Sequence, residues 1–406
     1  MKRFCLILSL AAFSFMAFAQ TIDPIQVVKD ISTYRAQKVK EARDAKTPLD
    51  AEKLSKECAA KAEEALKGID LTKIEPAKAL DWARVTVLAN RDKDTCDLCQ
   101  KFLTSNPDPK MKFAAQNLML TACERMGEGD MLAMMLPTVE PDTKQAAATI
   151  AILTANTYSD TISSKKGVDE AIKVLDAVEK KINYAEFTTP EEKSLAENAR
   201  GSVASAKAQF FMEQKKKDQA IATLDAALKE LTADGPMAKR IASSKTQYAL
   251  IDSMSPALDA EKMYGEYKGI ESLKGKVVIL DFFAHWCGPC IRSFPDMKAL
   301  YDANKDKGLE MIGVTTYYGY YKDENREKRD MPKDAEFAKM ADFMKEHSMN
   351  WPVVYTARES YAPFGVSVIP HVVVIARDGR VHKVKVGYSP ASFKAFKEDI
   401  EKLLKE

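Results

Sequence analysis

The stretch Val277–Pro295, VVILDFFAHWCGPCIRSFP, decides the fold of this chain because it places two cysteines where a strand turns into a helix. Val277 to Phe283 is a run of apolar, β-branched and aromatic residues of strand length. Gly288 and Pro289 then interrupt the run before helical periodicity begins. The pattern predicts a buried strand, a short turn and a helix that begins near Cys287.

The position of the two cysteines in this turn indicates redox chemistry. Cys287 is expected at the helix N-terminus, where unpaired backbone N–H groups and the positive end of the helix dipole favour a thiolate. Cys290 follows one turn later, within reach for a disulfide. Pro289 suits an early helical position because its missing N–H has no partner there. The spacing therefore predicts a reversible dithiol, with Cys287 as its exposed member.

Trp286-Cys287-Gly288-Pro289-Cys290 resembles the active site of thioredoxin, and several separate positions agree with this resemblance. They are Asp281, which matches a buried carboxylate; Pro295, which matches the proline of the active-site helix; Phe364 to Pro370, which includes Ile369 and resembles the segment entering a cis-proline; and Gly387, which matches a later glycine. The likeness covers roughly residues 256 to 406. The lead-in at residues 272–276, SLKGK, is similar to that of the TlpA/ResA-like disulfide reductases of bacterial envelopes.

The resemblance implies a role for each matched residue. Cys287 would attack a protein disulfide as a thiolate, and Cys290 would resolve the mixed disulfide. Asp281 would exchange a proton with Cys290, its pKa raised by burial, unless it is only a structural acid. Trp286 would shield the sulfurs and offer apolar surface to a partner. Pro370, if cis, would let a substrate strand pair beside Cys287; the alternative is a proline that only ends a strand.

Three features depart from the family. His285 stands where thioredoxins usually carry an acidic residue, and His371 stands where threonine is common. A protonated His285 would stabilise the thiolate and make the couple a stronger oxidant, whereas a histidine without a role is the alternative at both positions. The lysine that partners the buried aspartate in thioredoxins has no counterpart near residues 313–316.

Length and the N-terminal sequence predict an exported protein of two domains. A chain of 406 residues exceeds one ordinary core. Lys2 and Arg3, an apolar run and small residues at Ala17 and Ala19 predict a signal peptide over residues 1–19, with cleavage before Gln20. We expect helices over residues 20–254 and the thioredoxin-like part over residues 255–406. A bacterial periplasmic or secreted, soluble location follows as an expectation.

Charge and cysteine usage narrow the function classes. Without Lys2 and Arg3, 59 basic residues face 59 acidic ones, which offers no electrostatic case for nucleic acid. Six cysteines then remain, an even number that permits three disulfides in an oxidising compartment. For Cys96 and Cys99, a structural disulfide or pairings with Cys58 and Cys123 are favoured over a redox relay. A zinc site would have to combine all four of these cysteines, but they lack the paired CxxC spacing of such sites. Neither a metal nor a cofactor is therefore expected.

The region before residue 254 reads as helix after helix. Residues 24–45, 48–67, 76–90, 108–126 and 142–159 carry apolar residues at helical spacing, several behind a proline, aspartate or threonine start signal. Residues 169–177 are echoed by residues 218–226, which suggests stacked helical hairpins resembling tetratricopeptide (TPR) repeats. Their helices form either a scaffold with its own core or a surface for a partner protein. The predicted fold class is thus an N-terminal all-α domain of helical hairpins followed by a thioredoxin-like α/β fold with a mixed sheet flanked by helices.

The leading functional hypothesis is an exported thiol:disulfide oxidoreductase that reduces protein disulfides and is recharged by a membrane electron donor. One alternative is a disulfide oxidase or isomerase. Another is a helical-repeat binding protein or chaperone with an accessory redox domain. A peroxiredoxin is disfavoured because Ala284 stands where that family needs threonine or serine.

Overall fold

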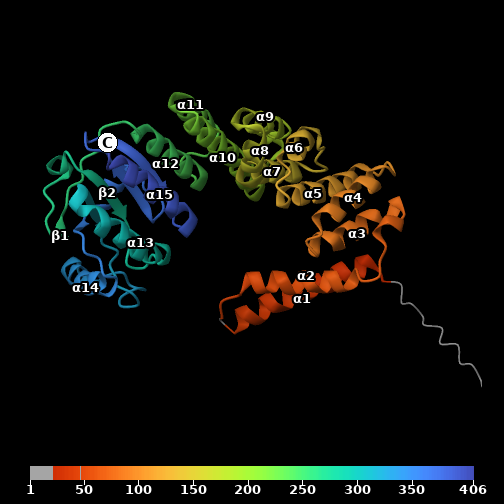
Figure 1. The fold of residues 1–406 in the computed structure, drawn as a ribbon, viewed down its shortest axis with the longest axis horizontal. Helices are drawn as coiled ribbons and strands as arrows, with labels where there is room; N and C mark the ends of the chain where they lie inside the picture. Colours follow the sequence, from red (N-terminus) through yellow and green to blue (C-terminus); the bar gives the residue numbers. More distant parts are fainter. Residues whose placement is uncertain (1–21, 46) are drawn as a thin grey trace, which may run out of the picture. The chain divides into compact units, whose positions relative to one another are not determined.

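A computed structural model describes residues 22–45 and 47–406, so the predicted signal peptide lies outside the described residues (Figure 1). The chain divides into two compact units. One holds the chain up to Asp142 with Ser164–Lys166, and the other holds Thr143–Ser163 with Gly167–Glu406. Within the described ranges, no helix combines the length and the hydropathy needed to cross a bilayer.

In the described chain from residue 24 to residue 250, all regular secondary structure is helical, which confirms the all-α prediction. The α-helices are α1 (Pro24–Asp44), α2 (Ala51–Ala65), α3 (Pro76–Leu88), α4 (Asp92–Leu103), α5 (Pro109–Arg125), α6 (Gly129–Met135), α7 (Lys144–Leu153), α8 (Ser159–Lys166), α9 (Val168–Glu179), α10 (Pro190–Glu213), α11 (Lys217–Leu228) and α12 (Pro236–Leu250). A π-helical turn, Thr154–Tyr158, interrupts the single helix expected over residues 142–159. The two echoed segments lie in α9 and α11, and their TPR-like character stays a prediction.

Side chains at the helix starts act as caps, including Asp108, at the start of a helix predicted from the sequence. The Asp108 side chain accepts a hydrogen bond from the Met111 N–H at the start of α5. At the start of α10, Thr189 and Glu192 form a reciprocal capping box. Each cap satisfies backbone donors that the helix itself leaves unpaired, which explains why these helices begin where they do.

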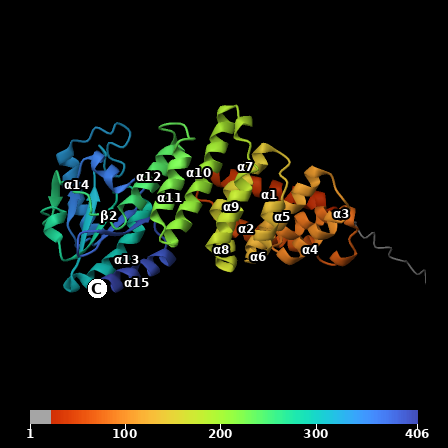
Figure 2. The same cartoon turned by 90° about the horizontal axis from the view of Figure 1, so that it is seen from above.

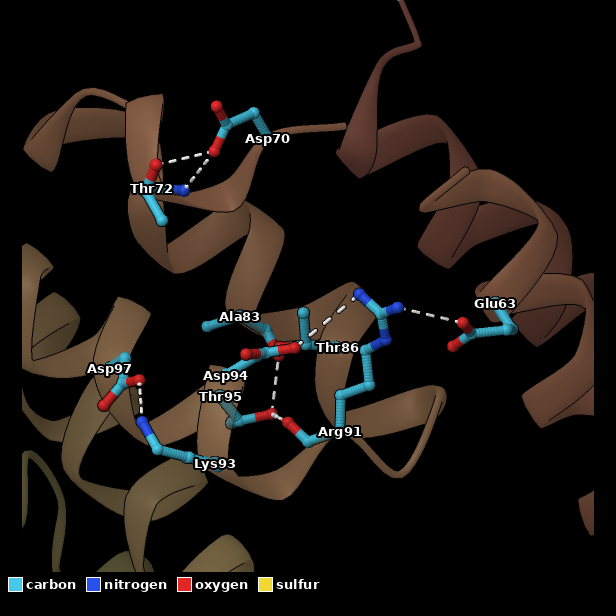
Figure 3. A network of polar contacts seen from close by, with 10 residues as sticks. All are labelled: Glu63, Asp70, Thr72, Ala83, Thr86, Arg91, Lys93, Asp94, Thr95 and Asp97. Carbon is cyan, nitrogen blue, oxygen red and sulfur yellow. Dashed lines mark hydrogen bonds and ion pairs between the residues drawn. The ribbon is translucent and has the colours of Figure 1, made fainter. Parts of the chain in front are cut away.

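Polar contacts join α2, α3 and α4 in the first unit (Figure 3). The buried hydroxyls of Thr86 on α3 and Thr95 on α4 lie 2.9 Å apart and share a hydrogen bond. Arg91, in the connection between these helices, pairs with Glu63 on α2 at 3.0 Å. Buried hydroxyls need such partners, so this contact favours one packing of the two helices.

The second unit ends in a mixed sheet of six strands in the order β1-β4-β3-β2-β5-β6. The strands are β1 (Lys262–Tyr264), β2 (Val277–Phe282), β3 (Leu309–Thr315), β4 (Val353–Tyr355), β5 (His371–Ile375) and β6 (Val381–Val386). The helices among them are α13 (Gly288–Asn304), α14 (Lys333–Glu346) and α15 (Pro390–Leu403). The predicted α/β fold is confirmed; β1 and the 3₁₀ helix η7 (Arg358–Phe364) were not predicted.

Strand β2 is buried on both faces and separates two cores. Val277 and Ile279 face the core that α13, α14 and α15 cover. Val278, Leu280 and Phe282 face the opposite core, which is closed by the end of α12, residues 258–273 and η7. Because side chains alternate along a strand, Asp281 belongs to the face beneath α13.

Helix α12 packs directly against the α/β part within this unit (Figures 1 and 2). Ser243 Oγ and Gln247 Nε2 both donate to the Gly365 carbonyl, at 2.7 and 2.8 Å. A Cβ on Gly365 would lie 2.8 Å from Gln247 Cγ. The change of secondary structure near residue 254 therefore does not coincide with a gap between compact units.

Cys58, Cys96, Cys99 and Cys123 are free thiols in the structure, against the expectation of structural disulfides. Cys96 on α4 and Cys123 on α5 nevertheless lie with their sulfurs 3.9 Å apart. This contact lowers the pKa of Cys123. Cys123 is therefore the thiol of this pair that ionises more readily.

Substituting Gly365 by alanine should destabilise the chain through both backbone strain and overpacking. Gly365 has φ +65° and no room toward α12. Gly275 also has a positive φ, +88°, but a Cβ added there would meet nothing within 4 Å, so Gly275→Ala is the matched control. We expect Gly365→Ala to lower the free energy of unfolding by about 1–3 kcal/mol more than the control, because only it overpacks. Urea denaturation measures both; equal losses would contradict the packing argument.

Incubation of the full chain with oxidised glutathione should join Cys96 to Cys123. The two sulfurs need only a small movement to bond, and Cys123 ionises first. Peptide mapping by mass spectrometry without reduction detects the link. Cys99→Ala should keep it. A bond between Cys96 and Cys99 instead would show that the sulfur contact does not direct the pairing.

Candidate functional site

A disulfide joins Cys287 and Cys290 at the N-terminus of α13. Their Cα atoms lie 5.3 Å apart. Cys287 is the N-cap residue, and its sulfur accepts a hydrogen bond from the Cys290 N–H at 3.2 Å. Gly288 and Pro289 open the helix, so the sequence CGPC forms its first turn. The strand, turn and helix predicted from the sequence thus meet at this disulfide.

The two cysteines differ in solvent exposure, but Cys287 is less exposed than predicted. The sequence predicts an exposed Cys287, yet only 4% of it is accessible in the disulfide, against 0% for Cys290. Cys287 is less exposed than predicted because it packs into the core beneath α13. Trp286 is 46% exposed and meets the ring of Tyr318 edge-on at 5.4 Å. Cys287 remains the more accessible residue of the pair, beside a large apolar side chain.

Asp281 is a fully buried carboxylic acid on the face of β2 beneath α13. Neither of its oxygens has a hydrogen-bond partner among the described residues. Burial disfavours the charged form and raises the pKa of Asp281 to about 7. The carboxyl therefore exchanges its proton near neutral pH.

Lys385 is the cation that acts on Asp281, and the sequence alone did not reveal it. The strand register places Asp281 opposite Val372, and Val372 opposite Lys385, in one row across β2, β5 and β6. The Lys385 Nζ donates to the Gly387 carbonyl at 2.7 Å. Its charge lowers the pKa of Asp281, but burial has the larger effect; burial also lowers the pKa of Lys385 itself. Residues 313–316, where the family pattern places this lysine, lie on and after β3, on the other side of β2.

His285 is buried, not solvent-facing, and packs among Tyr318, Tyr320 and Tyr321. The Lys322 backbone N–H donates to its Nδ1 at 3.5 Å. Burial lowers the pKa of His285 to about 4, so the ring is neutral at neutral pH. The expectation of a protonated histidine beside the dithiol is therefore wrong.

The Ile369–Pro370 peptide bond is cis, as the resemblance implies. His371 pairs with Phe282, so Pro370 lies next to the residues that lead from β2 into the dithiol turn. The Gly387 N–H donates to the Pro370 carbonyl at 2.8 Å, which ties the start of β5 to the end of β6. His371 is fully buried, and burial lowers its pKa to about 4.

The chemistry available here is that of the sulfurs. Over residues 22–45 and 47–406, no group of three or more histidine, cysteine, aspartate or glutamate side chains has an arrangement that could hold a metal ion. The site brings together a disulfide, a helix N-terminus and a buried acid that titrates near neutral pH. These parts serve thiol–disulfide exchange.

Comparison with known proteins agrees with this chemistry. Residues 252–404 match the Redoxin family model. The thiol-disulfide oxidoreductase ResA of Bacillus subtilis is 31% identical over 136 residues, which are 33% of this chain and 66% of that protein. ResA of Bacillus cereus is 27% identical over 166 residues, 40% of this chain and 82% of that protein.

A solved structure from Chlorobium tepidum, assigned as the thiol:disulfide interchange protein DsbE, is also similar. It is 27% identical, with a TM-score of 0.29, and the match covers 37% of this chain and 95% of that one. The relatives and the solved structure each match between 33% and 40% of this chain. On the family model, the ResA relatives and the geometry of the dithiol, residues 252–404 are an oxidoreductase domain of thioredoxin-superfamily type, similar to the TlpA/ResA-like proteins.

Proposed function

We propose that this chain is an exported thiol:disulfide oxidoreductase whose Cys287–Cys290 pair reduces disulfides in other proteins. The observation that carries the proposal is the disulfide at the N-terminus of α13, with Cys287 as the more accessible residue of the pair. The signal sequence read in residues 1–19 supports export. The Gly-Pro pair between the cysteines, which is part of the resemblance to thioredoxin, supports the reducing direction.

The exchange proceeds in two steps that balance. The Cys287 thiolate attacks one sulfur of the client disulfide, forms a mixed disulfide and releases the second client sulfur as a thiolate. The Cys290 thiolate then attacks Cys287, which releases the reduced client and restores the Cys287–Cys290 disulfide. Two electrons pass to the client, and its two thiolates take up two protons. The helix N-terminus stabilises the attacking thiolate.

Asp281 is the proposed acid and base for Cys290. It lies beneath α13 on the same face as Cys290, in the same buried environment. A pKa of about 7 lets its carboxylate accept the Cys290 proton at neutral pH and return it later. The charge of Lys385 shifts the protonation equilibrium of Asp281 toward the carboxylate.

Turnover requires a reductant of the dithiol class, which we place in a membrane electron-transfer protein. The helical part is proposed to hold a partner protein. An open groove of about 680 Å³ between α10 and α11 supports this second role. Its lining combines apolar Phe211 with charged Arg200 and Lys207, a mixture suited to a polypeptide.

Replacement of Cys287 by serine should abolish the acceleration of insulin reduction by dithiothreitol, because serine cannot form the mixed disulfide. Cys290→Ser should instead accumulate a mixed disulfide with a client protein, visible on non-reducing gels. Cys96→Ser, which removes a thiol of the first unit, is the control and should keep activity. Normal insulin reduction by Cys287→Ser would leave the helical binding role as the better account.

Replacement of Lys385 by methionine should raise the pKa of Asp281 above its present value of about 7, since the lost positive charge had favoured the carboxylate. The carboxylate fraction at pH 7 then falls. NMR titration of ¹³C-labelled aspartate in the oxidised protein measures the midpoint. Lys383→Met is the matched control, because Lys383 on the same strand pairs with Asp399. An unchanged midpoint in Lys385→Met would show that the two groups do not interact.

A further inference from the structure

A cleft of about 580 Å³ opens beside the dithiol. Trp286, the residue before Cys287, forms one wall. The loop after β3 supplies three tyrosines, and two arginines complete the lining together with Thr316. These residues are Tyr317, Tyr318, Tyr320, Arg329 and Arg358. None of them takes part in the exchange chemistry described above.

Internal contacts hold the loop that carries this lining. The carboxylate of buried Glu336 accepts hydrogen bonds from the backbone N–H groups of Tyr318 and Gly319, both at 2.8 Å. The Met331 N–H donates to the Gly319 carbonyl at 2.8 Å. A Cβ on Gly319 would lie 2.3 Å from the Arg329 carbonyl oxygen, so only glycine lets the two segments approach this closely. The chain thus places Arg329 against the tyrosine loop.

The two arginines of the cleft carry charges that the chain does not neutralise. In the described part of the chain, no carboxylate lies within ion-pair distance of Arg329 or Arg358. Three neighbouring cations differ, since each pairs with a carboxylate: Lys322 with Glu346, Arg326 with Asp323 and Lys333 with Glu261. Glu336 is occupied by backbone donors. The charged side chains that line the cleft are thus both cationic, Arg329 and Arg358.

Both guanidinium groups lie over aromatic rings. Arg329 lies 5.4 Å from the ring centre of Tyr320, and Arg358 lies 4.8 Å from that of Tyr361. Stacking restrains a guanidinium and leaves N–H donors at its edge, although Arg358 also interacts with the side chain of Tyr318, another lining residue. Planar donors of this kind match a carboxylate. Charge complementarity thus selects an acidic group and rejects a basic one.

We propose that this cleft binds an acidic side chain of the client polypeptide, close in sequence to the cysteine that Cys287 attacks. The inference rests on the proposed function and names its substrate class. Exposed Trp286 supplies apolar contact to the client segment, and Arg329 and Arg358 supply the charge selection. The cleft determines specificity, while the dithiol performs the exchange.

Two synthetic disulfide peptides that differ only in glutamate or glutamine beside the cysteine test the proposal. With the full, dithiothreitol-reduced chain, kcat/KM for the glutamate peptide should exceed that for the glutamine peptide by about fivefold to tenfold at low salt. The ratio should approach one at high salt, because screening weakens the attraction. Arg329→Gln with Arg358→Gln should bring the ratio near one at low salt as well.

Lys328→Gln is the matched control, since it removes an exposed cation of the same loop that does not line the cleft. It should keep the preference for glutamate. Equal rates for both peptides with the unaltered chain would overturn the cleft proposal and leave the reductase function standing, whereas reduction of neither peptide would refute the function itself. If the arginine substitutions slow reduction of glutathione disulfide but leave the peptide ratio intact, the occupant is a low-mass disulfide and the polypeptide proposal is wrong.

Discussion

Burial of β2 on both faces is the constraint on which the α/β part depends. The strand lies between β3 and β5, and each of its six residues is buried. Apolar side chains on alternate faces supply the two cores, so a shift in register by one residue would exchange the faces. The register in turn determines where the strand ends, and the disulfide forms directly beyond that end. The redox site is thus an extension of the hydrophobic core.

The same burial determines the charge state of the site. Asp281 and His285 both lie in low-dielectric surroundings, where the neutral form of each group is favoured. Lys385 is the counter-charge, held two strands away by the register of β5 and β6. Few charged groups lie close to the sulfurs, whereas the neighbouring cleft is lined by two arginines without a carboxylate partner among the residues that the structure describes. The dithiol and the proposed client-binding cleft therefore differ in their electrostatic environment.

Helix α12 connects the helical region of the second unit to the face of the sheet opposite α13. Its hydrogen bonds to Gly365 lie five residues before Pro370, in the segment that leads to the cis peptide bond. Ser243 Oγ also shares a hydrogen bond with Ser367 at 2.9 Å. The α/β part is therefore not joined to its helices by a simple linker.

The sequence alone determined the nature of the two parts and the central chemistry. Strand length, helical periodicity and the CGPC turn are local patterns, so most of the α/β elements and the cysteine pair could be read directly, and the resemblance to thioredoxin added Asp281. Tertiary structure alone decided that the charge of Lys385 acts on Asp281, that His285 is buried, and that Arg329 and Arg358 line one cleft with Trp286. These relations depend on strand register and on contacts between segments far apart in the chain. No local spacing encodes them, because packing and burial arise only when the whole unit folds.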